Sequence, residues 1–200
     1  MITTEVPAKD RTHTDICKAA LEGGGRLIQY REKNKTFAEM VKEATEIKKL
    51  CDEFDALFIV NDWIKLAKEV DADGLHLGQG DESIEEARKI LTGKIIGLSA
   101  TCLDGAIEAQ AKGADYIGAG PVFETPSKND AAEPFGLKTL AEIRKRVSVP
   151  IVAIGGITKE NMASVLEAGA DAVAVISAIA AADDMEKAIR DLINEFVAKR

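Results

Sequence analysis

A unit that repeats along the chain constrains its fold more than any other feature. Three helix-like segments end in the dipeptide Ala-Asp, and a short apolar run follows each of them: Gly74–Leu77 after Ala72-Asp73, Tyr116–Ala119 after Ala114-Asp115, and Ala172–Val175 after Ala170-Asp171. These runs do not alternate between apolar and polar residues, which is typical of strands buried on both faces of a parallel sheet. The repeat therefore predicts helices and parallel strands in regular alternation.

The same pattern extends over the rest of the chain. We expect further strands at Met1–Thr4, Arg26–Tyr30, Leu57–Asn61, Ile95–Ser99 and Ile151–Ile154. Helices with a 3.6-residue apolar period lie between the strands, most clearly at Thr36–Phe54 and Met185–Lys199. The fold class this predicts is α/β, a single-domain (β/α)8 TIM barrel with an eight-stranded parallel sheet over residues 1–200. A doubly wound open sheet is the alternative, but it more often carries a Gly-x-Gly-x-x-Gly turn, which the sequence lacks.

Composition excludes several classes of function. The chain of 200 residues is 46% hydrophobic and 30% charged, as in soluble globular proteins, and its net charge of -8 argues against a nucleic-acid binder. The three cysteines have no paired spacing, which favours reduced thiols in a cytoplasmic protein over zinc ligands or disulfides. The longest apolar stretch, Ala172–Ala182, is too short to span a bilayer, so we expect no membrane association.

The segment Gly118–Lys128 points to an anionic ligand. An apolar run ends there in glycine and proline, and Thr125, Ser127 and Lys128 follow with little bulk between them. Glycine lets the backbone approach a ligand closely, and hydroxyls beside a lysine are suitable donors to phosphate. By itself the segment is equally compatible with an exposed turn.

Polar residues also follow the second, third and fourth expected strands, and barrel enzymes bind their substrates at these strand ends. Gln29, Arg31 and Lys33 alternate along one side of the second strand, and an arginine fork matches phosphate oxygens. Asp62 and Asp81 follow the next two strands. Each aspartate alone is more simply a helix N-cap, but beside a phosphate cluster the pair predicts a Mg²⁺ site.

A second anion site is expected at the last two strands. Gly155-Gly156 follows the seventh strand, and Ile176-Ser177 opens a short Ala-rich helical turn after the eighth. Barrels of this type commonly bind phosphate there through loop amides. Two anion sites predict two phosphorylated substrates. His13 and His76 lie in poor places for a nucleophile–base pair, and we expect His76 to have a packing role.

Several motifs occur in one order along nearly the whole chain: Gln-Tyr-Arg-Glu-Lys at 29–33, Asn61-Asp62, Gly-Gln-Gly-Asp at 78–81, Gly-Leu-Ser at 97–99, Gly-Pro-Val-Phe-x-Thr-Pro-Ser-Lys at 120–128, Ala-Ile-Gly-Gly-Ile at 153–157 and Val-Ile-Ser at 175–177. In this order they resemble the thiamine phosphate synthase family. Two departures are Glu124, where proline is expected, and Ser127, where threonine is more usual.

The resemblance implies a transferase that joins a hydroxymethylpyrimidine diphosphate to a thiazole phosphate, giving thiamine phosphate and diphosphate. It implies one Mg²⁺ per subunit, held by Asp62 and Asp81, and a dissociative mechanism with catalytic roles for Arg31, Lys33, Ser99 and Lys128. The implied pyrimidine diphosphate site comprises Gln29, Tyr30, Arg31, Glu32, Lys33, Asn61, Ser99 and Lys128. The implied thiazole phosphate site comprises Thr125, Pro126, Ser127, Gly156, Ile176 and Ser177.

Three other functions are weighed against this one. A thiazole tautomerase of the same barrel family is expected to use a histidine at the end of the sixth strand, where this chain has Pro121. A Schiff-base aldolase needs a lysine buried at a strand end, whereas Lys33 and Lys128 are expected in loops. A non-catalytic sensor of thiamine precursors stays open, and the sequence is compatible with a homo-oligomer.

Overall fold

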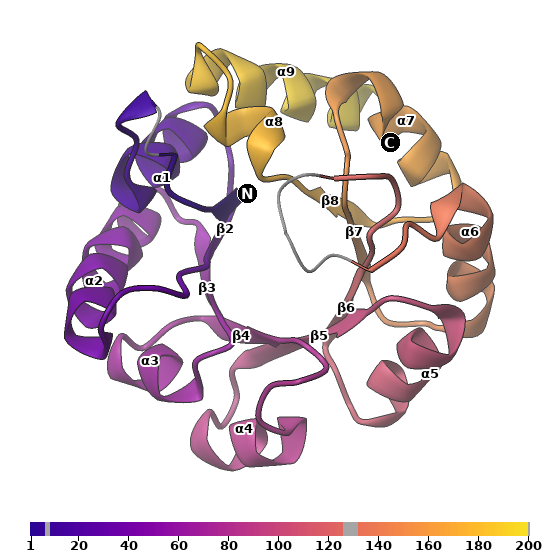
Figure 1. Cartoon of the computed structure of the whole chain (residues 1–200), viewed down its shortest axis with the longest axis horizontal. Coiled ribbons are helices and arrows are strands. Elements are labelled where there is room, and N and C mark those ends of the chain that lie inside the picture. Colours follow the sequence, from indigo (N-terminus) through magenta and orange to yellow (C-terminus); the bar gives the residue numbers. More distant parts are fainter. Residues whose placement is uncertain (7–8, 126–131, 200) are drawn as a thin grey trace.

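The computed structural model describes residues 1–6, 9–125 and 132–199 of the chain. Within these residues eight strands form one sheet in the order β1 to β8, and every neighbouring pair is parallel. The strands form an inner ring that the helices surround (Figure 1). Their bounds are β1 Ile2–Thr3, β2 Leu27–Tyr30, β3 Leu57–Asn61, β4 Gly74–Leu77, β5 Ile95–Ala100, β6 Tyr116–Ala119, β7 Ile151–Ile154 and β8 Ala172–Ala174.

The described part of the chain has nine helices, and eight of them follow the eight strands while α8 is an additional short turn. Their bounds are α1 His13–Glu22, α2 Phe37–Glu53, α3 Ile64–Glu69, α4 Ile84–Ile90, α5 Leu103–Ala111, α6 Gly136–Arg146, α7 Lys159–Glu167, α8 Ser177–Ala180 and α9 Met185–Ala198. The predicted barrel is confirmed. The doubly wound alternative is wrong because the strand order never reverses. None of the described helices is long and apolar enough to cross a membrane.

The Ala-Asp repeat of the sequence joins the amino ends of neighbouring strands. The Asp115 carboxylate accepts a 2.7 Å hydrogen bond from the Ile96 N–H and another of 2.7 Å from Arg88. The Asp115 N–H donates to the Ile96 carbonyl oxygen at 2.8 Å. The same pair of bonds joins Asp73 to Phe58 and Asp171 to Ile151. Each aspartate thus satisfies backbone groups where a strand begins, which explains its place in the repeat.

The ring closes between β8 and β1 with few contacts. β1 has two residues, shorter than the predicted strand Met1–Thr4, and its Ile2 N–H donates to the Val175 carbonyl oxygen at 3.0 Å. Side chains from the following segment strengthen this junction. Arg11 donates to the carbonyl oxygens of Ala180, Ala182 and Asp183, and Lys9 to that of Ala181. These bonds tie the start of the chain to the end of α8.

We predict that Asp115→Ala lowers the free energy of unfolding by roughly 1–3 kcal/mol, because it leaves the Ile96 N–H without its carboxylate partner. The turnover number below the melting temperature should not change, since Asp115 lies at the end of the barrel opposite the pocket. Urea denaturation measures the change. Glu108→Ala, which removes an exposed ion pair with Lys112, is the matched control and should cost at most about 0.5 kcal/mol. Equal losses in both variants would contradict the role given to Asp115.

Candidate functional site

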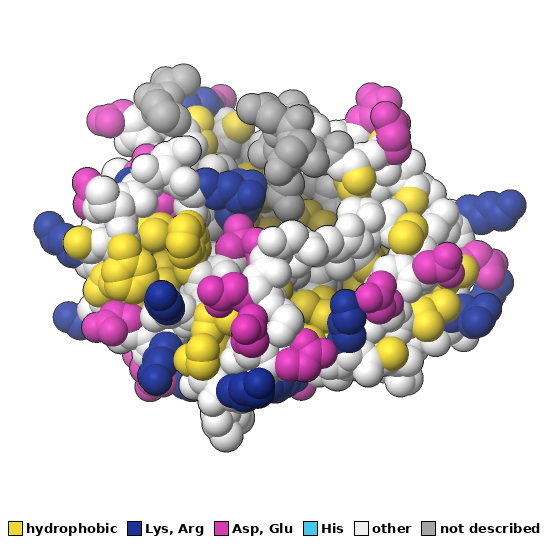
Figure 2. Space-filling view, turned by 60° about the horizontal axis from the view of Figure 1, so that its bottom comes forward, with side chains coloured by type: hydrophobic (Ala, Val, Ile, Leu, Met, Phe, Trp, Pro, Cys, Tyr) yellow, Lys and Arg dark blue, Asp and Glu magenta, His cyan; other side chains and the backbone are white. Residues whose placement is uncertain are grey.

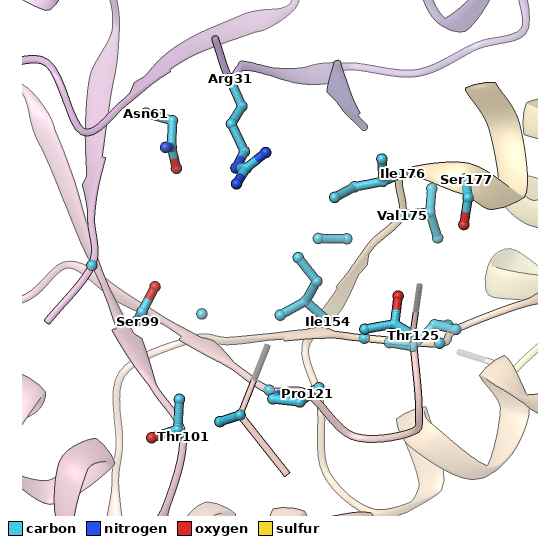
Figure 3. A pocket seen from close by; sticks show the side chains of 18 of the residues that line it. Arg31, Asn61, Ser99, Thr101, Pro121, Thr125, Ile154, Val175, Ile176 and Ser177 are labelled. Atoms are coloured by element: carbon cyan, nitrogen blue, oxygen red, sulfur yellow. The ribbon is translucent and has the colours of Figure 1, made fainter. Parts of the chain in front are cut away.

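A pocket of about 680 Å³ opens at the carboxyl ends of the strands. Its volume lies within the range of small-molecule sites. The residues that line it lie at or just after the carboxyl ends of seven strands, β2 to β8, and include Arg31, Asn61, Gly78, Ser99, Pro121, Gly156 and Ser177. Figure 3 shows Arg31 and Asn61 extending into the open centre, with Ser99 below them and Thr125, Ile176 and Ser177 across from them. The pocket therefore has two facing walls.

The first wall carries charge of both signs. Arg31 and Lys33 follow β2, and the Lys33 ammonium lies 3.9 Å from a carboxylate oxygen of Asp62, which follows β3. Asp81, after β4, completes this group. Basic and acidic side chains meet near the centre of the face in Figure 2. Local positive charge is thus present in a protein whose net charge is -8.

Neither Asp62 nor Asp81 is a helix N-cap, which was the simpler interpretation of each aspartate in the sequence. The N-cap of α3 is Trp63, and that of α4 is Ser83, whose hydroxyl accepts the Glu86 N–H. Asp81 instead accepts a 2.5 Å bond from the Gly78 N–H. Burial, followed by the neighbouring Asp81 carboxylate, raises the pKa of Asp62 to about 6. The Asp81 carboxylate therefore lies close enough to Asp62 to affect its protonation.

This pair suits a hard divalent cation. Mg²⁺ is usually bound by one or two carboxylates together with substrate phosphate oxygens rather than by a full cage of protein ligands. The described residues contain no cluster of three or more potential ligands, so a carboxylate pair is the arrangement they offer. Two carboxylates that repel each other in the absence of a cation would both gain by binding one.

A chain of hydrogen-bonded side chains supports Ser99 from below. The Ser99 hydroxyl lies 2.9 Å from Nε2 of His76, and Nδ1 of His76 lies 2.9 Å from the Tyr116 hydroxyl. Burial raises the pKa of Tyr116, and a hydrogen bond from Gln29 partly offsets this. Glycines leave room for these rings, because a Cβ atom at Gly97 would lie 2.1 Å from the Tyr116 ring. His76 is buried as predicted, but it also orients a pocket residue.

The second wall is built from glycines, hydroxyls and short side chains. Thr125, Gly155, Gly156, Ile176 and Ser177 line it. Gly156 has φ 63°, and a Cβ there would lie 2.4 Å from the Glu124 carbonyl oxygen, so this position requires glycine. The short helix α8 begins at the pocket with Ser177, as the Ala-rich sequence predicted.

The structure brings most, but not all, of the predicted residues to the pocket. Gln29 lies beneath it and bonds Tyr116, while the Tyr30 hydroxyl donates to Glu43 at 2.7 Å on the outer side of β2. Glu32 contacts His13 of α1, on the same outer side. Side chains alternate along a strand, so Tyr30 and Glu32 point away from the side that carries Arg31 and Lys33. Pro126, Ser127 and Lys128 lie outside the described residues.

Two features of the site were missed from the sequence. The His76–Ser99 contact follows from register, since His76 pairs with Gly97 on the neighbouring strand and Ser99 lies two residues further on the same face. An inward-facing histidine beside an inward-facing serine is a signal that strand alternation could have supplied. The contact of His13 with Glu32 depends on how α1 packs, and no sequence pattern indicates it.

The barrel and its pocket define an α/β-barrel enzyme with its site at the carboxyl ends of the strands. The family model described as thiamine monophosphate synthase matches residues 1–179. Thiamine-phosphate synthase of Chloroflexus aurantiacus is 45% identical over 192 residues, covering 96% of this chain and 89% of the relative. That of Methanosarcina mazei is 47% identical over 195 residues, covering 97% and 80%.

A solved structure of a related protein also matches this chain over almost its whole length. Thiamine phosphate pyrophosphorylase from Pyrococcus furiosus superposes with a TM-score of 0.92 at 42% sequence identity, covering 99% of this chain and 94% of that one. The chain belongs to the thiamine monophosphate synthase family. The predictions that it is an enzyme and a transferase of thiamine biosynthesis are confirmed at this level.

We predict that Asp62→Asn stabilises the metal-free protein above pH 6 but not near pH 3.5. The raised pKa means that the folded state binds this proton more tightly than the unfolded state, so stability falls as pH rises from about 4 through about 6. The variant should escape this loss, on the order of 2 kcal/mol. Thermal denaturation in EDTA at both pH values measures it.

Asp55→Asn is the matched control for this experiment. Asp55 has the same left-handed backbone, with φ 52° against 67° for Asp62, and lies outside the pocket. Asparagine tolerates this conformation as well as aspartate does. An equal gain in the two variants, or no dependence on pH for Asp62→Asn, would contradict the electrostatic explanation.

Proposed function

We propose that the protein joins a hydroxymethylpyrimidine diphosphate to a thiazole phosphate, forming thiamine phosphate and releasing diphosphate. The observation that carries this proposal is the pairing of two different walls in one pocket. One wall presents Arg31 and Lys33 beside two carboxylates, and the other presents Gly156 and Ser177 at the start of α8. Membership of the family supports the same reaction.

The first wall would bind the diphosphate. The Arg31 guanidinium offers parallel N–H donors to phosphate oxygens, and Lys33 adds a compact positive charge. The Asn61 amide and the Ser99 hydroxyl extend the polar surface toward the pyrimidine. The family resemblance adds Lys128 as a further residue that would bind the diphosphate.

One Mg²⁺ per subunit would be held by Asp62 and Asp81. When bound, the ion supplies positive charge to the departing diphosphate. Asp62 lies near Lys33. The ion that Asp62 would hold and the Lys33 ammonium would therefore both act on the same side of the leaving group. The second wall would hold the thiazole phosphate through Thr125, Gly156, Ile176 and Ser177, with Pro126 and Ser127 added by the resemblance.

The arrangement favours a dissociative reaction. The bond between the pyrimidine methylene carbon and the diphosphate oxygen breaks, and its electron pair leaves with the diphosphate. The resulting methylene cation is stabilised by the pyrimidine ring, and the thiazole nitrogen lone pair then forms the new C–N bond. No proton moves in these steps. Arg31 and Lys33 would stabilise the negative charge that develops, an effect worth about 3–4 kcal/mol for one well-placed donor.

The tautomerase alternative is disfavoured by the residue at the end of β6. Pro121 lines the pocket there and cannot shuttle a proton. The basic and acidic wall would also have no task on a substrate without diphosphate. A sensor that binds without turnover remains an outcome of the experiment below. We further propose a cytoplasmic location, and a homo-oligomer is compatible with the barrel.

We predict Mg²⁺-dependent formation of thiamine phosphate and diphosphate when the protein is incubated with both substrates. Asp81→Asn should reduce turnover at least 100-fold, because one of the two carboxylates for the cation is lost. Glu82→Gln, which changes the adjacent exposed carboxylate outside the main pocket, should retain activity. Chromatography of thiamine phosphate with and without EDTA gives the measurement.

Each contrary outcome of this assay has a definite meaning. Full activity of Asp81→Asn would refute the metal assignment but not the transferase. Binding of both substrates by a folded protein without product would favour the sensor. Conversion of a thiazole phosphate tautomer alone would favour the isomerase.

A further inference from the structure

Glu32 is a buried carboxylate between the two basic residues of the first wall. It is 8% exposed, and its Oε1 atom accepts 2.6 Å hydrogen bonds from the N–H groups of both Lys33 and Asn34. Its Oε2 atom lies 3.1 Å from Nε2 of His13. An ionised carboxylate only accepts hydrogen bonds, so the His13 Nε2 donates. Three donors thus converge on one side chain.

His13 is held as firmly as its partner. It is 1% exposed, its Nδ1 atom lies 2.7 Å from the Thr3 hydroxyl, and its ring centroid lies 4.8 Å from that of Tyr30. It is also the first residue of α1, so its backbone is part of a helix with a full capping box at Thr12. The histidine therefore joins β1, α1 and the segment after β2.

The same segment is anchored on its other side. The Trp63 indole N–H donates to the Glu32 carbonyl oxygen at 3.3 Å, and Trp63 directly follows Asp62. Both the side chain and the backbone of Glu32 are therefore held by residues outside its own segment. Burial alone would raise the pKa of Glu32, but the bonds from Asn34, His13 and Lys33 hold it below its usual range. The carboxylate stays ionised and keeps its acceptor role.

We propose that His13 and Glu32 are positioning residues that fix the backbone of residues 31–34 so that Arg31 and Lys33 enter the pocket together. The inference rests on the proposed function, in which those two side chains bind the diphosphate. Alternation along the chain turns Glu32 outward to His13 of α1, while Arg31 and Lys33 turn to the pocket. A fixed segment has less conformational freedom to lose on binding, which strengthens binding and aligns the leaving group.

The test compares His13→Ala and Glu32→Gln with the wild type in steady-state kinetics. Both variants should raise KM for the pyrimidine diphosphate or lower its kcat/KM, roughly 10- to 100-fold, while KM for the thiazole phosphate stays within about two-fold. His13→Gln keeps a side-chain N–H that can donate to Glu32 and should recover much of the loss. Glu32→Gln keeps the size of the side chain and serves where His13→Ala fails to fold.

Ile16→Val is the control for a general loss of stability. Ile16 is fully buried in α1, one turn from His13, and its side chain has no group that could form a hydrogen bond to the segment 31–34. It should lower the melting temperature without a change in either KM. The proposal is overturned if His13→Ala and Glu32→Gln lower the melting temperature and leave both KM and kcat/KM for the pyrimidine diphosphate unchanged.

Binding of inorganic diphosphate separates this inference from the proposed function. Calorimetry with Mg²⁺ should show at least 10-fold weaker binding to His13→Ala than to the wild type. If the wild type binds diphosphate here but forms no thiamine phosphate in the activity assay, the proposed reaction is refuted. Weaker diphosphate binding by His13→Ala would still support the positioning role in that case. Equal affinities, or no binding by either protein, would overturn the inference.

Discussion

Closure of the strand ring is the constraint on which the pocket depends. The charged wall is built after β2, β3 and β4, and the glycine wall after β7 and β8. These segments are far apart in the sequence and face each other because the ring returns to its start. Closure at β1 relies on a bond between Ile2 and Val175 and on the side chain of Arg11, rather than on a long ladder. Parallel pairing elsewhere supplies the regular spacing.

The aspartates at the two ends of the barrel have different electrostatic surroundings. At the amino ends of the strands, Asp73, Asp115 and Asp171 are satisfied by backbone N–H groups and add to stability. At the carboxyl ends, Asp62 and Asp81 face each other, and the raised pKa of Asp62 reflects a cost to the metal-free fold. The aspartates at the amino ends stabilise the barrel, whereas the pair at the carboxyl ends, which we propose binds the cation, lowers stability, a common trade between stability and function.

The sequence predicts the barrel and much of the pocket because both follow from period and position. Buried parallel strands are apolar without alternation, and strand ends meet at one face, so Arg31, Asp62 and Asp81 could be placed together. The motif placed Glu32 in the binding site together with Arg31 and Lys33, although strand alternation turns its side chain away from theirs. His13 was given no role, since its contact with Glu32 joins segments nineteen residues apart through tertiary packing.

The short stretch from Lys9 to His13 touches both sides of the pocket. Arg11 holds the end of α8, whose first residue borders the glycine wall, and His13 holds Glu32 in the segment that carries the charged wall. One piece of backbone that lines neither wall therefore contacts the segments that carry both of them. In the proposed reaction the two substrates bind to walls that the start of α1 connects from outside the pocket.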